Sequence, residues 1–274
     1  MGRASGPAIA SSLGGGSRLE NLGAIRNSGW EFSGNGRVLE GARFGWDVTF
    51  TGSTNTNKIL KLDPTIRPAG VIRDQIGYPI SGLWTRPIVG FADVNGSGAV
   101  DPAEVILGDT ATYNGPSTPT REFSLTNGIS FPKYGIRLSA LLDYRGGFRK
   151  LNATELNRCF ANVCQGLTDP NASVAEQARA VTARLFTFSG FAEDASFMRL
   201  REVGVTWTAP TSIARKLRAR RAAITLTGRN PGLWTDYSGI DLEVSTRLDD
   251  SDRTRDFPTV PAVRYWITRV SLGY

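Results

Sequence analysis

Oxygen-bearing side chains recur at regular intervals in the segment DVNGSGAVDPAE, which begins at residue 93. Read as a twelve-residue loop, it has side-chain oxygens at positions 1, 3, 5, 9 and 12 and glycine at position 6. A hard cation such as Ca²⁺ needs this density of oxygen ligands, and the glycine allows the sharp turn. The candidate ligands are Asp93, Asn95, Ser97, Ala99 (through its carbonyl), Asp101 and Glu104. The pattern predicts a calcium loop, but flanking helices are not evident, so an Asx-turn loop without a metal is the alternative.

Two cysteines, Cys159 and Cys164, are the other candidates for chemistry. Their spacing predicts a small disulfide, with two separate thiols as the alternative, and two thiols are too few for a metal cage. The chain has no histidine, which excludes Ser-His-Asp and Cys-His catalysis and most zinc sites. No phosphate loop, nucleophile elbow or telling pair of acids occurs. The sequence therefore predicts that the protein is not an enzyme.

Three aromatic residues, Trp84, Trp234 and Tyr237, fall in long polar connections. Exposed rings there could stack on a sugar or pack against a peptide. The alternative is that they only fill the interior of their own loops.

The segment Arg121 to Arg145 indicates which elements must position these residues. Apolar side chains alternate with polar ones through REFSLTNGISF and again through YGIRLSALLDYR, interrupted only by Asn127 and Leu141. Strict alternation predicts two β-strands joined by a tight hairpin, each about as long as a tilted strand that crosses a bilayer. Phe131 and Tyr134 flank the turn, where a lipid–water interface favours aromatic rings. The pattern suits a soluble hairpin equally well.

Similar alternation predicts about seven strands in all, and Tyr274 ends the last one. Every second connection between these strands is long, namely 53–120, 146–195 and 230–262. A single short loop helix is expected at 172–186, capped by Asn171 or Ser173. Residues 1–18 are rich in Gly, Ser and Ala and are predicted to be loose.

The arrangement of the connections separates a membrane protein from a soluble one. Along the chain they run short, long, short, long, short, long. Neighbouring antiparallel strands then place all short turns at one end of the sheet and all long loops at the other. Outer-membrane barrels show this asymmetry, with short periplasmic turns and long extracellular loops. The sequence therefore predicts an all-β, antiparallel transmembrane barrel segment with a membrane girdle that includes Phe131, Tyr134 and Tyr274. A soluble, calcium-assisted, glycan-binding β-sandwich is the alternative.

Charge and apolar runs limit the remaining options. The formal net charge is +7, and the one dense basic run is RKLRARR at 215–221. This run is interpreted as a solvated turn, with a nucleic-acid patch as the less favoured reading. No apolar run has the length of a transmembrane helix, and the N-terminus has no apolar segment of signal-peptide length. We therefore expect either that the protein is cytoplasmic or that this chain lacks its true beginning, with a signal peptide before residue 1.

Five segments, in chain order, resemble the C-terminal part of SusC/RagA-type TonB-dependent outer-membrane receptors. Two of them are Ser196–Val203 through Ala209–Pro210, and Gly228–Asn230 followed by Trp234–Glu243. The others are Asn21–Gly23 with Asn27–Glu31, Gly77–Glu104, and Phe257–Pro258 with the terminal strand. The chain departs from the family pattern at two points. Leu242 stands where the family usually has proline, and Pro231–Gly232 separate Asn230 from Leu233, whereas asparagine and leucine are adjacent in the family pattern.

The resemblance implies that residues 19–274 form part of a barrel of twenty-two strands whose plug domain lies before residue 1. A complete small barrel is the alternative. It implies an outer-membrane location and a role in importing oligosaccharides or peptides, with a SusD-like surface lipoprotein as partner. It also implies contact with outer-membrane lipid, recognition by the barrel-assembly machinery, and contact with TonB only through N-terminal parts that this chain lacks. Calcium is the one cofactor expected, no nucleic acid is expected as a partner, and the nutrient is not specified.

Overall fold

The computed structural model describes residues 23–64, 66–185, 187–243, 254–256 and 260–274. The predicted loose segment 1–18, and the resemblance at Asn21–Leu22 and Phe257–Pro258, lie outside these residues.

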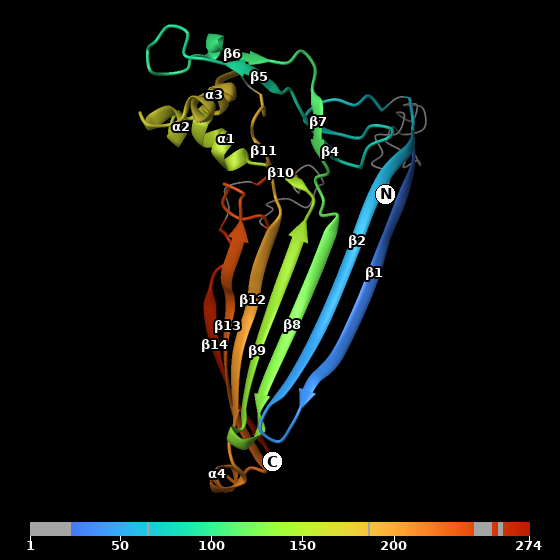
Figure 1. Ribbon diagram of the computed structural model, residues 1–274, viewed down its shortest axis with the longest axis vertical. Coiled ribbons are helices and arrows are strands. Elements are labelled where there is room, and N and C mark those ends of the chain that lie inside the picture. Colours follow the sequence, from blue (N-terminus) through green and yellow to red (C-terminus); the bar gives the residue numbers. More distant parts are fainter. Residues whose placement is uncertain (1–22, 65, 186, 244–253, 257–259) are drawn as a thin grey trace, which may run out of the picture.

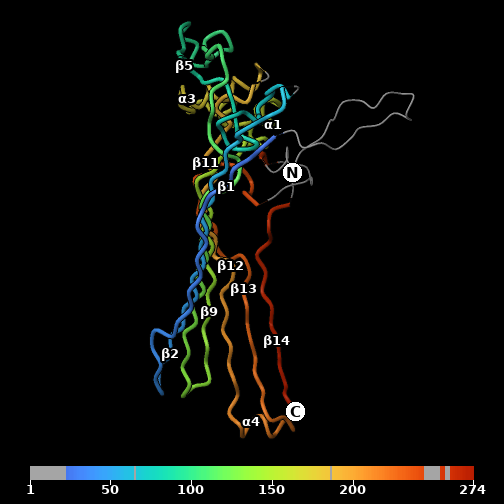
Figure 2. The backbone as a smooth tube through the Cα atoms, turned by 90° about the vertical axis from the view of Figure 1, so that its right-hand side faces the viewer, coloured from blue at the N-terminus to red at the C-terminus, as the bar shows by residue number. Residues whose placement is uncertain are grey.

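Seven long strands form one antiparallel sheet in the order β1-β2-β8-β9-β12-β13-β14, which confirms the predicted number (Figure 1). The strands are β1 Gly23–Glu40, β2 Gly45–Leu62, β8 Arg121–Phe131, β9 Ile136–Gly146, β12 Phe197–Thr208, β13 Arg221–Thr235 and β14 Tyr265–Gly273. Each strand pairs with the next long strand in the chain, as a meander of hairpins requires. The sheet is a single tall, curved layer, in which β13 and β14 spread to one side of β1 and β2 (Figure 2).

The described sheet is open, because β1 and β14 lie at its two edges and do not pair with each other. Among the described residues no second layer covers its apolar face, so the architecture is not that of a β-sandwich. The buried apolar clusters lie around the upper ends of the strands and in the loops above them. In the described part of the chain, no helix has the length and apolar character needed to cross a bilayer.

Short and long connections sort to opposite ends of the sheet, as predicted (Figure 1). Residues 41–44, the 3₁₀ turn η3 Pro132–Tyr134 and residues 209–220 make the lower end. Residues 63–120, 147–196 and 236–264 make the upper end, and we call their described parts the loop layer. Short strands in the loop layer pair into small sheets. They are β3 Ile72–Arg73, β4 Gly82–Thr85, β5 Ile88–Phe91, β6 Val105–Leu107, β7 Thr112–Gly115, β10 Arg149–Leu151 and β11 Ala192–Asp194.

Two predictions about local structure were wrong. The first was the expectation of one loop helix, because the loop layer contains three α-helices and two 3₁₀ turns. These are α1 Ala153–Phe160, α2 Gln165–Thr168, α3 Val174–Thr182, η2 Pro102–Glu104 and η4 Ala183–Leu185. The lower end contains a further helix, α4 Thr211–Lys216. Only α3, capped by Ser173, corresponds to the predicted helix. In addition, β2 continues to Leu62, beyond the predicted strand end near residue 52. Its polar upper half lacks an alternating pattern but still pairs with β1 through backbone hydrogen bonds.

Candidate functional site: the two faces of the sheet and the loop layer

Alternation along each strand gives the sheet one apolar and one polar face. The apolar faces of neighbouring strands coincide in register, since Ile129 lies opposite Leu138 and Leu138 lies opposite Val205. Large apolar side chains on this face remain exposed, for example Leu138 at 38% and Val270 at 65%. An exposed apolar surface of this extent is unfavourable in water and typical of a face that contacts lipid or another protein.

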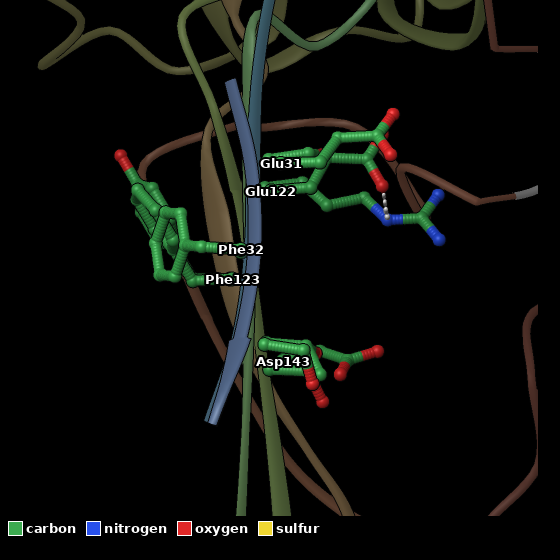
Figure 3. Close-up of a pocket in the computed structure, with 12 residues that line it drawn as sticks. Glu31, Phe32, Glu122, Phe123 and Asp143 are labelled. Carbon is green, nitrogen blue, oxygen red and sulfur yellow. Dashed lines mark ion pairs between the residues drawn. The ribbon is translucent and has the colours of Figure 1, made fainter. Parts of the chain in front are cut away.

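Four aromatic rings form a band on the apolar face at its upper end. The Phe32 centroid lies 5.4 Å from that of Phe50 and 6.3 Å from that of Phe123, and Tyr144 lies 5.9 Å from Phe123. Gly52 leaves the space for this cluster, because a Cβ at that position would lie 2.4 Å from the Phe32 ring. Figure 3 shows Phe32 and Phe123 on one side of the sheet and Glu31, Glu122 and Asp143 on the other. The sequence analysis missed this band, although the parity of Phe50 and Phe123 was visible.

The predicted girdle residues lie at the opposite end of the same face. Phe131 contacts the ring of Phe44 at 5.8 Å, while Tyr134 and Tyr274 are largely exposed. Eight residues separate Phe123 from Phe131 on β8, which is about 27 Å along the strand. Because strands in such barrels tilt, this length suits an apolar band about 25 Å tall between two aromatic girdles.

Asn127 lies midway between the two aromatic bands, on the apolar face. Its Oδ1 accepts a hydrogen bond of 3.3 Å from the indole nitrogen of Trp46 on β2. Polar groups are costly in hydrocarbon unless they have a partner. The indole therefore explains how the one break in the alternation of β8 is accommodated.

The polar face carries a network of ion pairs near the loop layer. Arg201, at a bulge in β12, binds Asp143 at 2.7 Å and both carboxylate oxygens of Glu243. Arg199 binds Asp241 at 2.6 Å, and both side chains are almost fully buried. Breaking a buried pair is strongly destabilising, because it leaves an unpaired charge. The network therefore holds the segment 236–243 of the loop layer against the polar face of β12.

A second ion pair crosses the polar face near the lower end. Arg137 on β9 binds Asp47 on β2 through two hydrogen bonds of 2.7 Å. The pair passes over Gly128 on the intervening strand, where a Cβ would lie 2.1 Å from the guanidinium. Arg137, Asp143 and Arg145 all lie on the polar face of β9, and Arg145 lies 3.9 Å from Glu122.

The predicted calcium loop forms a compact turn that ends in η2. Asp93 accepts backbone hydrogen bonds from Ser97 and Gly98, and Glu104 accepts bonds from Asp101 and Val94. The backbone N–H of Asp101 is the main reason that the pKa of Glu104 is lowered from its ordinary value. Asn95 donates to Asp101, and the Ser97 hydroxyl donates to the carbonyl of Ala99. These hydrogen bonds order the loop without a metal, and calcium binding there stays a prediction.

The three candidate ligand-binding aromatics are not brought together. Trp84 is 7% exposed and packs at 4.8 Å against Tyr78 and at 5.4 Å against Tyr113, whose pKa is raised by burial to about 12. Tyr237 is also buried, and its pKa is raised mainly by this burial. Both rings therefore fill the interior of the loop layer in this conformation. Only Trp234, at the upper end of β13, is half exposed and available for stacking on a ligand.

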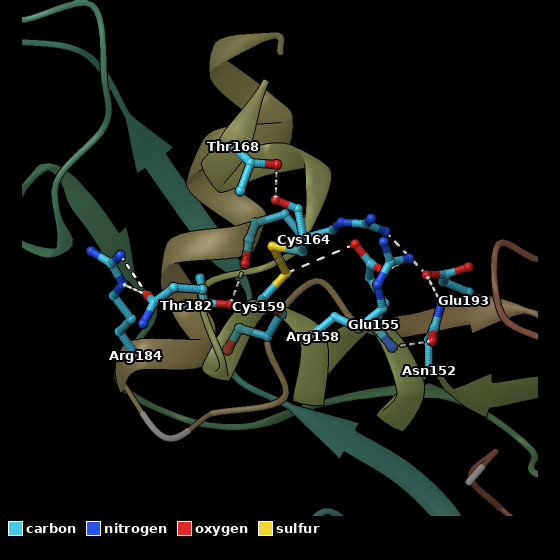
Figure 4. The surroundings of a disulfide bond; sticks show 12 residues. Asn152, Glu155, Arg158, Cys159, Cys164, Thr168, Thr182, Arg184 and Glu193 are labelled. Atoms are coloured by element: carbon cyan, nitrogen blue, oxygen red, sulfur yellow. Dashed lines mark hydrogen bonds and ion pairs between the residues drawn. A yellow bond between two sulfur atoms is a disulfide. The ribbon is translucent and has the colours of Figure 1, made fainter. Parts of the chain in front are cut away.

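The two cysteines are joined in the structure (Figure 4). The disulfide links the last turn of α1 to the residue that precedes α2, and it packs with Ala180 and Phe191 in one buried cluster. Within the described residues, Glu155 with these two cysteines is the only group of three acidic or sulfur-bearing side chains whose ligand atoms lie close together. Because the disulfide uses both sulfur atoms, that cluster is a structural link between helices.

Comparison with known proteins finds similar receptors and similar folds. No family model matches the chain. TonB-dependent receptor P3 of Formosa agariphila is 24% identical over 94% of this chain, and TonB-dependent receptor P26 of the same organism is 26% identical over 84%. The RagAB peptide importer in its 'open-open' state covers 97% of this chain with a TM-score of 0.69 and 18% identity. The chain is similar in sequence to TonB-dependent receptors and in fold to part of the RagAB importer.

The chain spans about 30% of the length of these relatives. The RagAB importer in its 'closed-closed' state also superposes, with a TM-score of 0.64 and 21% identity over 85% of this chain and 28% of that one. These structural likenesses establish the fold of this chain. They agree with an antiparallel sheet that would be one part of a larger barrel.

Proposed function

We propose that this receptor segment forms part of the wall and of the extracellular loops of an outer-membrane importer. The imported nutrient is an oligosaccharide or a peptide, and TonB supplies the energy through parts of the receptor outside this chain. One observation carries the proposal: the apolar face of a single-layer sheet is exposed between two aromatic bands, in a chain that matches TonB-dependent receptors. The RagAB relatives, described as peptide importers, support the transport role.

The orientation follows from the lengths of the connections. The short turns at the lower end face the periplasm, and the loop layer faces the cell exterior. The polar face, with its ion pairs, then lines the water-filled interior. A SusD-like surface lipoprotein binds above the loop layer as a lid, and the C-terminal strand ending in Tyr274 is the signal for the barrel-assembly machinery.

Flotation tests the membrane part of the proposal. The full chain, folded in detergent and mixed with phosphatidylcholine vesicles, should move with the vesicles through a density gradient and resist extraction by carbonate. A soluble glycan-binding sandwich, the alternative architecture, would remain in the dense aqueous fraction. Recovery of a soluble monomer without detergent would therefore refute the proposal.

Uptake by the receptor that contains this chain tests the transport part. Arg201→Met removes the cation that holds Glu243 and Asp143 together, and so weakens the attachment of the segment 236–243 to the barrel wall, which Arg199 still contacts through Asp241. Uptake of the nutrient should fall while the amount of receptor in the outer membrane stays the same. Arg229→Met is the matched control, because it breaks one exposed pair with Glu202 and releases no loop. Equal uptake by the two variants would show that the anchored segment has no part in import.

A further inference from the structure

The basic turn between β12 and β13 has no role in the wall or in the loop layer. Five of the seven residues at 215–221 are basic: Arg215, Lys216, Arg218, Arg220 and Arg221. All five are exposed, and in the described part of the chain none of them makes an ion pair. The sequence has no Asp or Glu between Glu202 and Asp236, nor any after Asp256, so no acid close in sequence offsets this charge. A concentrated, unpaired positive charge indicates an anionic partner.

The turn is rigidly attached to the end of the sheet. Ala214 and Ala219 are buried, and the backbone of Ala219 donates to the carbonyl of Ala214. The backbone N–H of Arg220 donates to the carbonyl of Gly273 at 2.7 Å, which fixes the turn beside the C-terminal Tyr274. The small buried side chains bring α4 close to the sheet, and the long basic side chains extend away from it.

Apolar side chains accompany the charge. Ile213 on α4 and Leu217, the residue that caps its C-terminus, lie one helical turn apart, so they share a face, and both are exposed. Trp207 on the apolar face of β12 is also partly exposed, just before the turn. Apolar and basic side chains together, at the level where an aromatic girdle ends, are characteristic of elements that lie in the headgroup region of a bilayer. Nucleic acid would account for the charge but not for the apolar pair.

We propose that this turn is a binding site for anionic phospholipid headgroups of the periplasmic leaflet. The inference rests on the proposed function, because the orientation of the sheet places α4 at that leaflet (Figure 1). Ile213 and Leu217 enter the boundary between headgroups and acyl chains, and the basic side chains contact the lipid phosphates. The site would fix the depth of the lower barrel rim in the membrane.

Spin-labelled lipids test the proposal with the full chain reconstituted in phosphatidylcholine vesicles. The fraction of labelled lipid immobilised by the protein is measured for phosphatidylglycerol and for phosphatidylcholine. One basic side chain at an anionic surface favours association by about fivefold, so we expect a preference of about two- to fivefold averaged over the lipids around the protein. The preference should vanish in 1 M salt, where the screening length is about 3 Å.

A matched pair of variants assigns the preference to the turn. Arg215→Gln/Lys216→Gln/Arg220→Gln should lose it. Arg26→Gln/Lys58→Gln/Lys61→Gln should keep it, because it removes the same charge from exposed side chains at the upper end of β1 and β2. The heat-dependent mobility of each variant on a gel shows whether it has folded, and the salt titration of the unmodified chain is independent of any variant.

Four outcomes would overturn the inference: equal association of the two lipids, equal loss in both variants, displacement by inorganic phosphate beyond that by chloride at the same ionic strength, or tighter binding of a short RNA than of phosphatidylglycerol. A chain that does not float with phosphatidylcholine vesicles would instead refute the proposed function. The two failures are therefore distinguishable.

Discussion

An arginine on the apolar face of β9 should lower the free energy of unfolding by an amount that depends on its depth in the bilayer. Ala140 lies opposite Asn127, midway between the aromatic bands, and its side chain points toward the expected hydrocarbon. An arginine at the midplane of an outer-membrane barrel costs about 2–4 kcal/mol. Ala140→Arg should therefore lower the free energy of unfolding from vesicles by about 2–4 kcal/mol.

Two further variants on the same strand separate hydrocarbon from an ordinary protein core. Ile136 lies four residues from Ala140, about 13 Å along the strand, opposite Phe131 and Trp207 near the lower interface. The arginine penalty falls to about 0–1 kcal/mol there, so Ile136→Arg should cost less than Ala140→Arg. Ser139→Arg introduces the same side chain on the polar face, where the free energy of unfolding should change by only about 0.5 kcal/mol.

The assay is reversible urea unfolding of the vesicle-inserted chain, followed by tryptophan fluorescence. Equal costs for Ala140→Arg and Ile136→Arg would mean that the apolar face contacts protein, since a packed core has no gradient with depth. A cost for Ser139→Arg as large as that for Ala140→Arg would mean that the polar face is not in contact with water. Either result would refute the assignment of the two faces.

Three other predictions concern single contacts. Trp46→Phe removes the donor to Asn127 and should lower the free energy of unfolding in vesicles by about 1 kcal/mol; in an Asn127→Leu background the same change should cost much less. Cys159→Ser opens the disulfide with Cys164 and should destabilise the α1–α3 region by about 2 kcal/mol. Hydrogen exchange should then rise in α1 and α3 but not in β8 or β9, and a reductant should reproduce the effect in the unmodified chain. Calcium should give a calorimetric signal that Glu104→Gln weakens, and absence of any signal at millimolar calcium would show that the loop binds none. Because the pKa of Glu104 is lower in the folded loop than in the unfolded chain, its stabilising contribution is present above the unfolded pKa and should be lost as the pH falls through the folded pKa.

The sequence alone predicted the sheet well, because apolar and polar residues alternate along a strand that has one apolar face. The alternation in REFSLTNGISF and YGIRLSALLDYR located β8 and β9, and the lengths of the connections predicted which end carries the loops. Periodicity gave no signal for the upper half of β2, where polar residues lie on both faces. Helices α1 and α2 were missed because they are too short to show a clear period of 3.6.

The candidate sites depended much more on contacts between distant segments. Trp84 and Tyr237 are residue types that often bind ligands, and only the packing of the loop layer shows that they are buried. The ion pairs of Arg199 and Arg201 join residues about forty positions apart, a pairing that no local pattern can specify.

The sequence by itself determined which side chains lie on the apolar face of the sheet and which on the polar face, because that choice is made residue by residue along a strand. Only the tertiary structure decided which charges neutralise one another, and among the described residues the basic side chains at 215–221 make no ion pair. The physical reason is that an ion pair requires two groups within a few ångströms, and the register of β12 against its neighbours and the fold of the loop layer set those distances.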